Sequence, residues 1–442
     1  MAAKKPSASS KATRAYKHVR SVDVWLWDQK VGTVARDPKF NFYAFAYTPE
    51  FSALGIEPSP LKMPVQAGHV FLFTDLPEAT YRRLPAMLSD ALPDDFGNAL
   101  IDRWMAERGI AQMQITALDR LAYMSTRAMG ALQFKPARGP ASRTATAIVL
   151  ADLVQQARNA VRGIIDADDH AHAALRSIID VGTSAGGARA KAVIAWNRDT
   201  NEIRAGQVVA PDGFEFWLLK FDGMGPDREL GPSQDYGRIE YAYHLMAKAA
   251  GIEMMESRLL EENGRAHFMT KRFDREQSGQ RHHIQTLCAM AHLDYRKKGT
   301  NSYTQLFATM KELSLPYQAM EEGFRRMVFN VMGRNCDDHT KNFSFRLRQH
   351  GPWELAPAYD VTFAHNPLGE WTNQHLMSAN GKFADFSEDD LLAEASRYGV
   401  GTARRVIAEV RASIENWRIF AKRAGLAEDA TTVIEKQLLL LD

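Results

Sequence analysis

The chain has 442 residues, more than a single compact core normally contains, so two or three packed subdomains are expected. Lys and Arg total 55 against 53 Asp and Glu, and the formal net charge of +2 excludes a chain-wide positive field for binding nucleic acid. Two cysteines and no apolar stretch of roughly 20 residues argue against a disulfide framework and a membrane span, which favours a cytoplasmic protein.

The sequence of the N-terminal third predicts a basic tail followed by a mixed α and β unit. Residues 1–20 carry six Lys and Arg and no acid, in an Ala- and Ser-rich background typical of a disordered tail; a transit peptide is the alternative. The unit at 21–135 combines alternating apolar residues, which indicate strands, with apolar residues at helical spacing. The expected elements are strands at 22–26 and 40–47 with a turn at Gly32 between them, and helices at 85–92 and 98–109.

A linker at 136–147, which lacks large apolar side chains, separates this unit from the rest of the chain. Residues 148–315 mix strand and helix patterns, whereas residues 316–442 are dominated by helical periodicity. The fold class expected is therefore α+β. The expected elements are a helix at 147–159, a glycine loop at 182–187, strands at 192–196 and 214–221, and helices at 239–250, from 317 onward and from a capping Ser387 onward.

The strongest chemical signal is a polar cluster after the helix that starts near 317. Asp337 and Asn342 are five positions apart, the same spacing as the catalytic Asp and the metal-binding Asn of the protein-kinase catalytic loop. Asp360 follows an apolar stretch 18 residues beyond Asn342 and could supply a second metal ligand. The alternative for both segments is an ordinary turn, where Asp and Asn are favoured because they bond to the backbone.

Two further places could bind phosphate. Lys220 lies inside a strongly apolar strand, where an ammonium requires an anion such as ATP phosphate or Glu240, expected in the first turn of the following helix. Gly186 and Gly187 permit a close backbone approach to phosphate. The alternatives are a lysine that reaches solvent from a sheet edge, and a plain hairpin loop. A glycine loop, a strand Lys, a helix Glu, Asp-x-x-x-x-Asn and an isolated Asp follow the order of a kinase active site, which predicts phosphoryl transfer.

From Val22 onward the sequence resembles the HipA family of bacterial toxin kinases. The similar segments are Leu-Pro-Asp-Asp-Phe-Gly at 92–97, the loop at 184–191, Lys-Arg-Phe-Asp-Arg at 271–275 and Asp-Asp-His-Thr-Lys-Asn-Phe at 337–343. The resemblance implies a HipA-like fold, distantly similar to protein kinases. It would have a small strand-rich N-terminal subdomain, a mixed α/β nucleotide lobe and an all-helical C-terminal lobe, with ATP and Mg²⁺ as cofactors.

The resemblance also implies a role for individual residues. The implied catalytic residues are Asp337, His339 and Lys341, with Asn342 and Asp360 as ligands of Mg²⁺. The implied nucleotide-binding residues are Lys220, Glu240, Gly186, Gly187, Lys271 and Phe273, and Ser184 matches a regulatory serine that is autophosphorylated.

The sequence departs from the family pattern at three places. Asp338 stands where glycine is usual, Arg189 and Ala190 replace Gln-Glu, and Lys271 replaces a common Glu. The implied substrate is glutamyl-tRNA synthetase or another aminoacyl-tRNA synthetase. The implied partner is a HipB-like helix-turn-helix antitoxin, through which DNA would be bound only indirectly. A catalytically weak co-repressor and a metabolite kinase are the alternatives.

Overall fold

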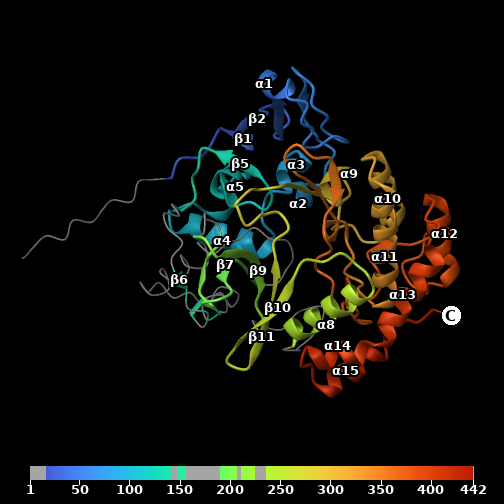
Figure 1. Ribbon diagram of the computed structural model, residues 1–442. Coiled ribbons are helices and arrows are strands. Elements are labelled where there is room, and N and C mark those ends of the chain that lie inside the picture. Colours follow the sequence, from blue (N-terminus) through green and yellow to red (C-terminus); the bar gives the residue numbers. More distant parts are fainter. Residues whose placement is uncertain are drawn as a thin grey trace, which may run out of the picture.

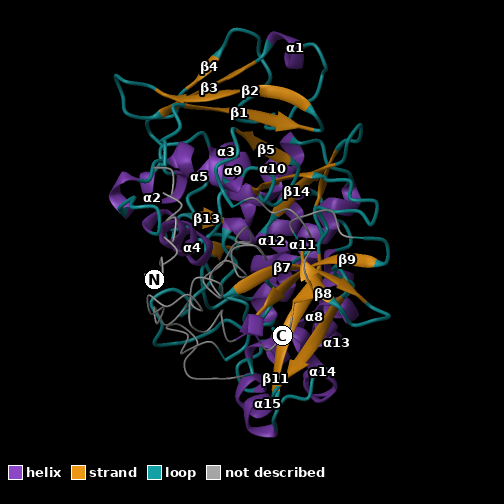
Figure 2. Cartoon of the chain, turned by 90° about the vertical axis from the view of Figure 1, so that its left-hand side faces the viewer, coloured by secondary structure: helices purple, strands orange, loops and turns teal. Residues whose placement is uncertain are grey.

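The computed structural model describes residues 16–140, 147–148, 150, 152–154, 190–206, 211–223 and 235–441. The chain runs from a blue N-terminal sheet at the top of Figure 1, through green and yellow strands, to orange and red helices. Figure 2 shows the N-terminal sheet above a second sheet, with helices between and behind them. This is the α+β architecture that the sequence predicts.

The N-terminal sheet has five antiparallel strands in the order β4-β3-β2-β1-β5. The predicted turn at Gly32 is wrong, because the turn lies at Trp27 and Asp28, which both have positive φ as a two-residue hairpin requires. Gly32 is instead inside β2, where a Cβ would lie 2.2 Å from the carbonyl oxygen of Ala46. The strands are β1 (Ser21–Leu26), β2 (Gln29–Arg36), β3 (Tyr43–Tyr47), β4 (Val70–Phe71) and β5 (Leu132–Lys135).

Short helices connect the strands of this unit, and both predicted helices are present with shifted ends. The side chain of Asp94 caps α4 by accepting a 2.9 Å hydrogen bond from the amide of Gly97, which explains why this helix starts before the predicted residue. The helices are α1 (Pro49–Ser52), α2 (Glu78–Tyr81), α3 (Ala86–Ser89), α4 (Asp95–Ala106), η1 (Gln112–Gln114) and α5 (Ala117–Met124).

The second sheet has the order β10-β11-β9-β7-β8-β6, with antiparallel neighbours. The predicted strands at 192–196 and 214–221 are β7 and β9, and the predicted helix at 239–250 is α8. The predicted helix at 147–159 is wrong at its start, since 147–148 form a strand, and the predicted glycine loop lies outside the described residues. The elements are β6 (Ala147–Ile148), β7 (Lys191–Asn197), β8 (Ile203–Ala205), β9 (Phe214–Lys220), α8 (Tyr236–Ala249), β10 (Ser257–Glu262) and β11 (Arg265–Lys271).

Helices dominate the C-terminal part, but it is not all-helical as expected, because short strands lie within residues 344–378. The predicted helix from 317 is α11, and Ser387 caps α12 together with Asp390 as predicted. The helices are α9 (Leu287–Ala291), α10 (Tyr303–Glu312), α11 (Tyr317–Met332), η2 (Thr340–Asn342), α12 (Glu388–Tyr398), α13 (Ala403–Glu415), α14 (Trp417–Arg423) and α15 (Glu428–Glu435). The strands are β12 (His283–Thr286), β13 (Asn301–Ser302), β14 (Ser344–Leu347), β15 (Trp353–Leu355) and β16 (Met377–Ser378).

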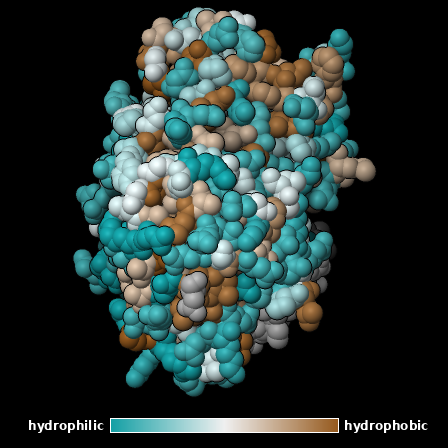
Figure 3. All heavy atoms as spheres, turned by 90° about the vertical axis from the view of Figure 1, so that its right-hand side faces the viewer, coloured by the Kyte–Doolittle hydropathy of each residue, from teal (hydrophilic) through white to brown (hydrophobic). Residues whose placement is uncertain are grey.

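Two large apolar cores meet along the second sheet. Ile194, Trp217 and Leu219 of this sheet belong to the core of the N-terminal unit. The buried face of α8 belongs instead to the core of the C-terminal helices. The β9–α8 junction therefore lies where the two cores adjoin. The face in Figure 3 is mainly hydrophilic, with small separate apolar areas, and no helix in the described ranges has the length and apolar character needed to cross a bilayer.

Candidate active site

Lys220 lies at the end of β9 and forms ion pairs with two carboxylates. Its ammonium contacts Glu240 on α8 and Asp360 on the segment after β15. Strand β9 is central in its sheet, between β11 and β7, so the alternative of a lysine at a sheet edge is wrong. Glu240 lies in the second turn of α8, not the first as predicted, because the helix begins at Tyr236. Side chains from three separate segments thus converge on one buried ammonium.

The electrostatics of this group favour the charged forms of Lys220 and Asp360. Burial opposes the charged form of Lys220, but attraction to Asp360 and Glu240 raises the pKa of Lys220 above its ordinary value. Burial likewise opposes ionisation of Asp360, but attraction to Lys220, with smaller contributions from Lys191 and His339, lowers the pKa of Asp360 to about 2. Lys220, Glu240 and Asp360 together carry a net charge of −1, which favours a further cation nearby.

Asp360 has an unusual backbone and is connected to the predicted catalytic segment. Its φ of 53° is in the left-handed region, which Asp tolerates better than most residues and which is often found at functional sites. The preceding Tyr359 donates a 2.6 Å hydrogen bond to the carbonyl oxygen of Lys341, and its hydroxyl is 2.5 Å from that of Ser344. These bonds place the Asp360 segment directly against the segment that contains Asp337 and Asn342.

The segment between Asp337 and Asn342 closes on itself. The amide nitrogen of Asn342 donates a 2.7 Å hydrogen bond to the carbonyl oxygen of Asp337, which leaves the Asn342 amide oxygen as the end that can ligate a cation. The Asp337 side chain is 49% exposed, and one of its oxygens lies 3.9 Å from Nε2 of His339. His339 is also one of the groups whose charge helps to lower the pKa of Asp360.

Lys341 interacts with the N-terminal unit. Its ammonium lies 4.9 Å from the ring centroid of Tyr295. Burial opposes its charged form, but attraction to Asp90 is the main influence that raises the pKa of Lys341. Asp90 itself accepts a 2.6 Å hydrogen bond from the amide of Thr286 at the start of α9. Attraction to Asp90 therefore couples the catalytic segment electrostatically to the unit formed by residues 21–135.

Phe273 and Lys271, the two residues expected on the adenine side of the nucleotide, lie in different surroundings. The Phe273 ring stacks on Tyr359 with 5.6 Å between centroids, adjacent to Asp360. Lys271 instead donates a 2.7 Å hydrogen bond to Glu215 on the neighbouring strand β9. The remaining predicted residues, Ser184, Gly186 and Gly187, lie outside the described residues.

No site role was expected for several charged residues that the structure places near this site. Lys191 on β7 forms a 3.1 Å ion pair with Asp94 at the start of α4, with side chains 3% and 8% exposed. Its position in an apolar strand, like that of Lys220, was an available signal. Asp338 and His375 form a second buried pair at 2.8 Å, and no local pattern marks His375 as its partner.

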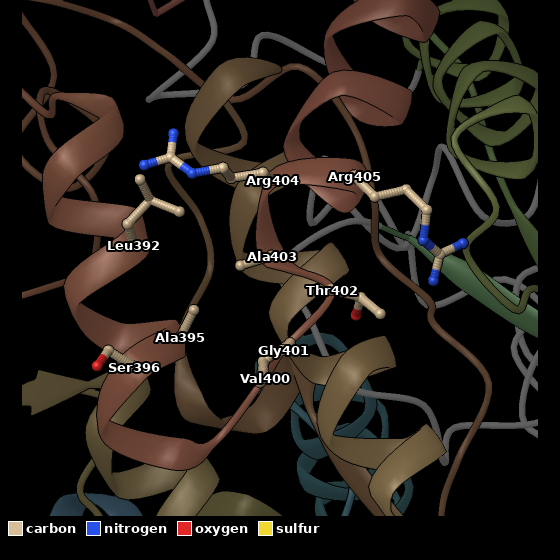
Figure 4. A pocket seen from close by; sticks show the side chains of 9 residues that line it. All are labelled: Leu392, Ala395, Ser396, Val400, Gly401, Thr402, Ala403, Arg404 and Arg405. Atoms are coloured by element: carbon tan, nitrogen blue, oxygen red, sulfur yellow. The ribbon is translucent and has the colours of Figure 1, made fainter.

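A pocket of about 520 Å³ lies elsewhere, between α12 and α13 (Figure 4). Its lining combines apolar residues such as Leu392 and Val400 with Arg404 and Arg405. Both arginines pair with glutamates, Arg404 with Glu388 and Arg405 with Glu321 and Glu409. Among the described residues, the lining contains none of the predicted site residues, so the candidate active site is the Lys220 and Asp337 region and not this pocket.

The fold of the chain is similar to that of a solved HipA toxin. The HipA toxin of Shewanella oneidensis MR-1, solved in complex with HipB and operator DNA, is similar with a TM-score of 0.66 over 95% of this chain and 96% of that chain, at 19% identity. The Helicobacter pylori proinflammatory kinase CtkA gives a TM-score of 0.32 at 13% identity, over 51% of this chain and 88% of that chain.

Sequence comparison defines the family. The Y4dM protein of Sinorhizobium fredii (strain NBRC 101917 / NGR234), whose name marks it as a candidate kinase, is 26% identical over 204 residues, which are 42% of this chain. The match spans 49%, about half, of that curated relative. The HipA N-terminal domain matches residues 22–135, and the HipA-like C-terminal domain matches residues 183–418. Because these two domains account for most of its length, the chain belongs to the HipA family.

Proposed function

We propose that this chain is an ATP- and Mg²⁺-dependent protein serine/threonine kinase of the HipA type, which acts as a growth-arrest toxin. The observation that carries the proposal is the contact of Lys220 with both Glu240 and Asp360. Phosphoryl transfer needs cations against the phosphates and oxygen ligands for the metal, and little covalent chemistry from the protein. The Lys220 region supplies both kinds of group, and Asp337 lies on the segment bonded to it.

Each side chain takes a role that follows from its position. Lys220, held by Glu240, binds ATP phosphates, while Asn342 and Asp360 supply the amide and carboxylate oxygens that Mg²⁺ prefers. Mg²⁺ held by these two side chains would supply positive charge against the phosphates. The half-exposed Asp337 accepts the proton of the attacking hydroxyl. His339 and Lys341 hold the catalytic segment in place, His339 beside Asp337 and Lys341 against the N-terminal unit.

We also propose roles in nucleotide contact, regulation and partner binding. Phe273 and Lys271 would contact the adenine side, and Gly186 and Gly187 the phosphates. Ser184 would be autophosphorylated to silence the enzyme. The substrate proposed is glutamyl-tRNA synthetase or another aminoacyl-tRNA synthetase. The HipB-like antitoxin is proposed because the similar Shewanella HipA was solved with HipB and operator DNA; DNA would then be bound only through that antitoxin.

The test is phosphoproteomics of a bacterial host after controlled expression, with purified protein, Mg²⁺ and labelled ATP in parallel. Wild-type protein should label a protein substrate and arrest growth, whereas Asp337→Asn should lose both. Asp389→Asn, an equally conservative change of an exposed carboxylate on α12, is the matched control and should behave as wild type. Equal labelling by Asp337→Asn would refute the site. Labelling of small molecules alone would favour a metabolite kinase, and no labelling with retained antitoxin binding would favour a co-repressor.

A further inference from the structure

Asp338, the neighbour of Asp337, is fully buried and accepts hydrogen bonds from several segments at once. Its Oδ2 accepts a 2.7 Å bond from the hydroxyl of Tyr303 and lies 2.8 Å from Nδ1 of His375. Its Oδ1 accepts bonds from the backbone amides of Leu376 (2.7 Å) and Met377 (3.3 Å). One carboxylate thus joins the catalytic segment to the start of α10 and to the strand β16.

The partner side chains are as buried as Asp338 itself. Tyr303 and His375 are both 0% exposed, and the ring of Phe386 packs edge-on against the imidazole at 5.3 Å. Burial disfavours the charged imidazole, but attraction to Asp338, with a smaller contribution from Cys336, raises the pKa of His375 to about 10. At neutral pH the pair is therefore a buried ion pair, whose geometry is sensitive to small shifts because the interior screens charge poorly.

The network continues to the other side of Asp337. The amide of Asn330 on α11 donates a 3.0 Å bond to the hydroxyl of Tyr303. Asn335 in turn donates a 2.9 Å side-chain bond to the amide oxygen of Asn330. The residues on both sides of Asp337 are consequently fixed to the same helices, α10 and α11.

We propose that Asp338 and His375 are positioning residues, which hold the backbone of the catalytic segment so that Asp337 points at the attacking hydroxyl. This inference rests on the proposed function. The Asp337 side chain is 49% exposed, and the backbone that carries it sets the direction in which its carboxylate leaves the segment. A catalytic group displaced by about 1 Å can lose on the order of 100-fold in rate, so a rigid anchor next to it has a kinetic consequence. Asp338 is also the position at which this segment departs from the pattern it resembles.

Two variants weaken the hydrogen bonds of Asp338 without removing a group that touches substrate. Tyr303→Phe preserves the ring and deletes the hydroxyl that donates to Asp338 and accepts from Asn330, and Asp338→Asn removes the negative charge while keeping an acceptor. Tyr47→Phe is the matched control, because this buried tyrosine also donates one hydrogen bond, of 2.7 Å to the carbonyl oxygen of Met63, but lies in the N-terminal sheet. Each variant is measured for kcat, KM for ATP and melting temperature, and for hydrogen exchange of residues 335–343 and 375–378.

The expected result is a fall in kcat of roughly 100-fold for Asp338→Asn and about tenfold for Tyr303→Phe, with KM for ATP within about threefold of wild type. Exchange should accelerate in both segments, while Tyr47→Phe changes neither. Lower melting temperatures with wild-type kcat, measured well below unfolding, would overturn the proposal. If the wild type transfers no phosphate, the proposed function fails. The exchange data then test the positioning role separately, because unchanged exchange at 335–343 in both variants would show that Asp338 does not hold this segment.

Discussion

The buried charges around Lys220 lead to a quantitative prediction for the free energy of unfolding. In Lys220→Met the carboxylates of Glu240 and Asp360 lose their shared cation, and stranding a buried charge in this way costs about 3–5 kcal/mol. In Asp360→Asn the Lys220–Glu240 pair survives. The pKa of Asp360 is lowered from 3.8 to about 2, so its stabilisation is present above pH 3.8 and is lost as pH falls through about 2. That shift corresponds to about 2 kcal/mol at pH 7, the loss expected for Asp360→Asn.

The assay is urea unfolding at pH 7 without nucleotide, followed by circular dichroism. The double variant Lys220→Met/Asp360→Asn should be more stable than Lys220→Met alone, by on the order of 1–2 kcal/mol, because it removes one of two like charges. Lys271→Met is the matched control, since its pair with Glu215 is partly exposed and should be worth at most about 1 kcal/mol.

Two results would refute this reasoning. One is a Lys220→Met protein that is no less stable than Lys271→Met, which would mean that Lys220 does not compensate buried carboxylates. The other is a double variant whose destabilisation equals the sum of the two single changes, because that additivity would show that the three charges do not interact.

Three further predictions follow from individual contacts. Gly237→Ala would place a Cβ 1.9 Å from the carbonyl oxygen of Ala266 and push α8 away from β11; thermal denaturation should show a loss of about 1–3 kcal/mol, and calorimetry should show weaker ATP binding. Lys191→Met strands the buried carboxylate of Asp94 and should cost about 3 kcal/mol in urea unfolding; a cost under about 1 kcal/mol would contradict the buried pair. The raised pKa of His375 implies stability that is full below pH 6.5 and is lost as pH rises through about 10, by on the order of 5 kcal/mol; His375→Asn should lack this dependence.

Periodicity and residue order in the sequence predicted several helices and strands and part of the candidate site. Alternation at 22–26 predicted a strand, and helical spacing from 317 predicted α11, because each pattern reflects which face of a local element is buried. The spacing of Asp337 and Asn342 also pointed to a kinase-like segment, and in the structure the Asn342 side chain bonds to the backbone of Asp337.

Tertiary structure decided the features that depend on contacts between distant segments. The hairpin turn lies at Trp27 and Asp28, since Gly32 is needed where β2 meets the backbone of β3, a contact that no local pattern shows. The pairing of Asp338 with His375 joins residues 37 apart, and the contact of Lys220 with Asp360 spans 140. Sequence spacing identifies side chains that share one turn or strand, whereas only the packed chain brings together charges from separate elements and buries them from water.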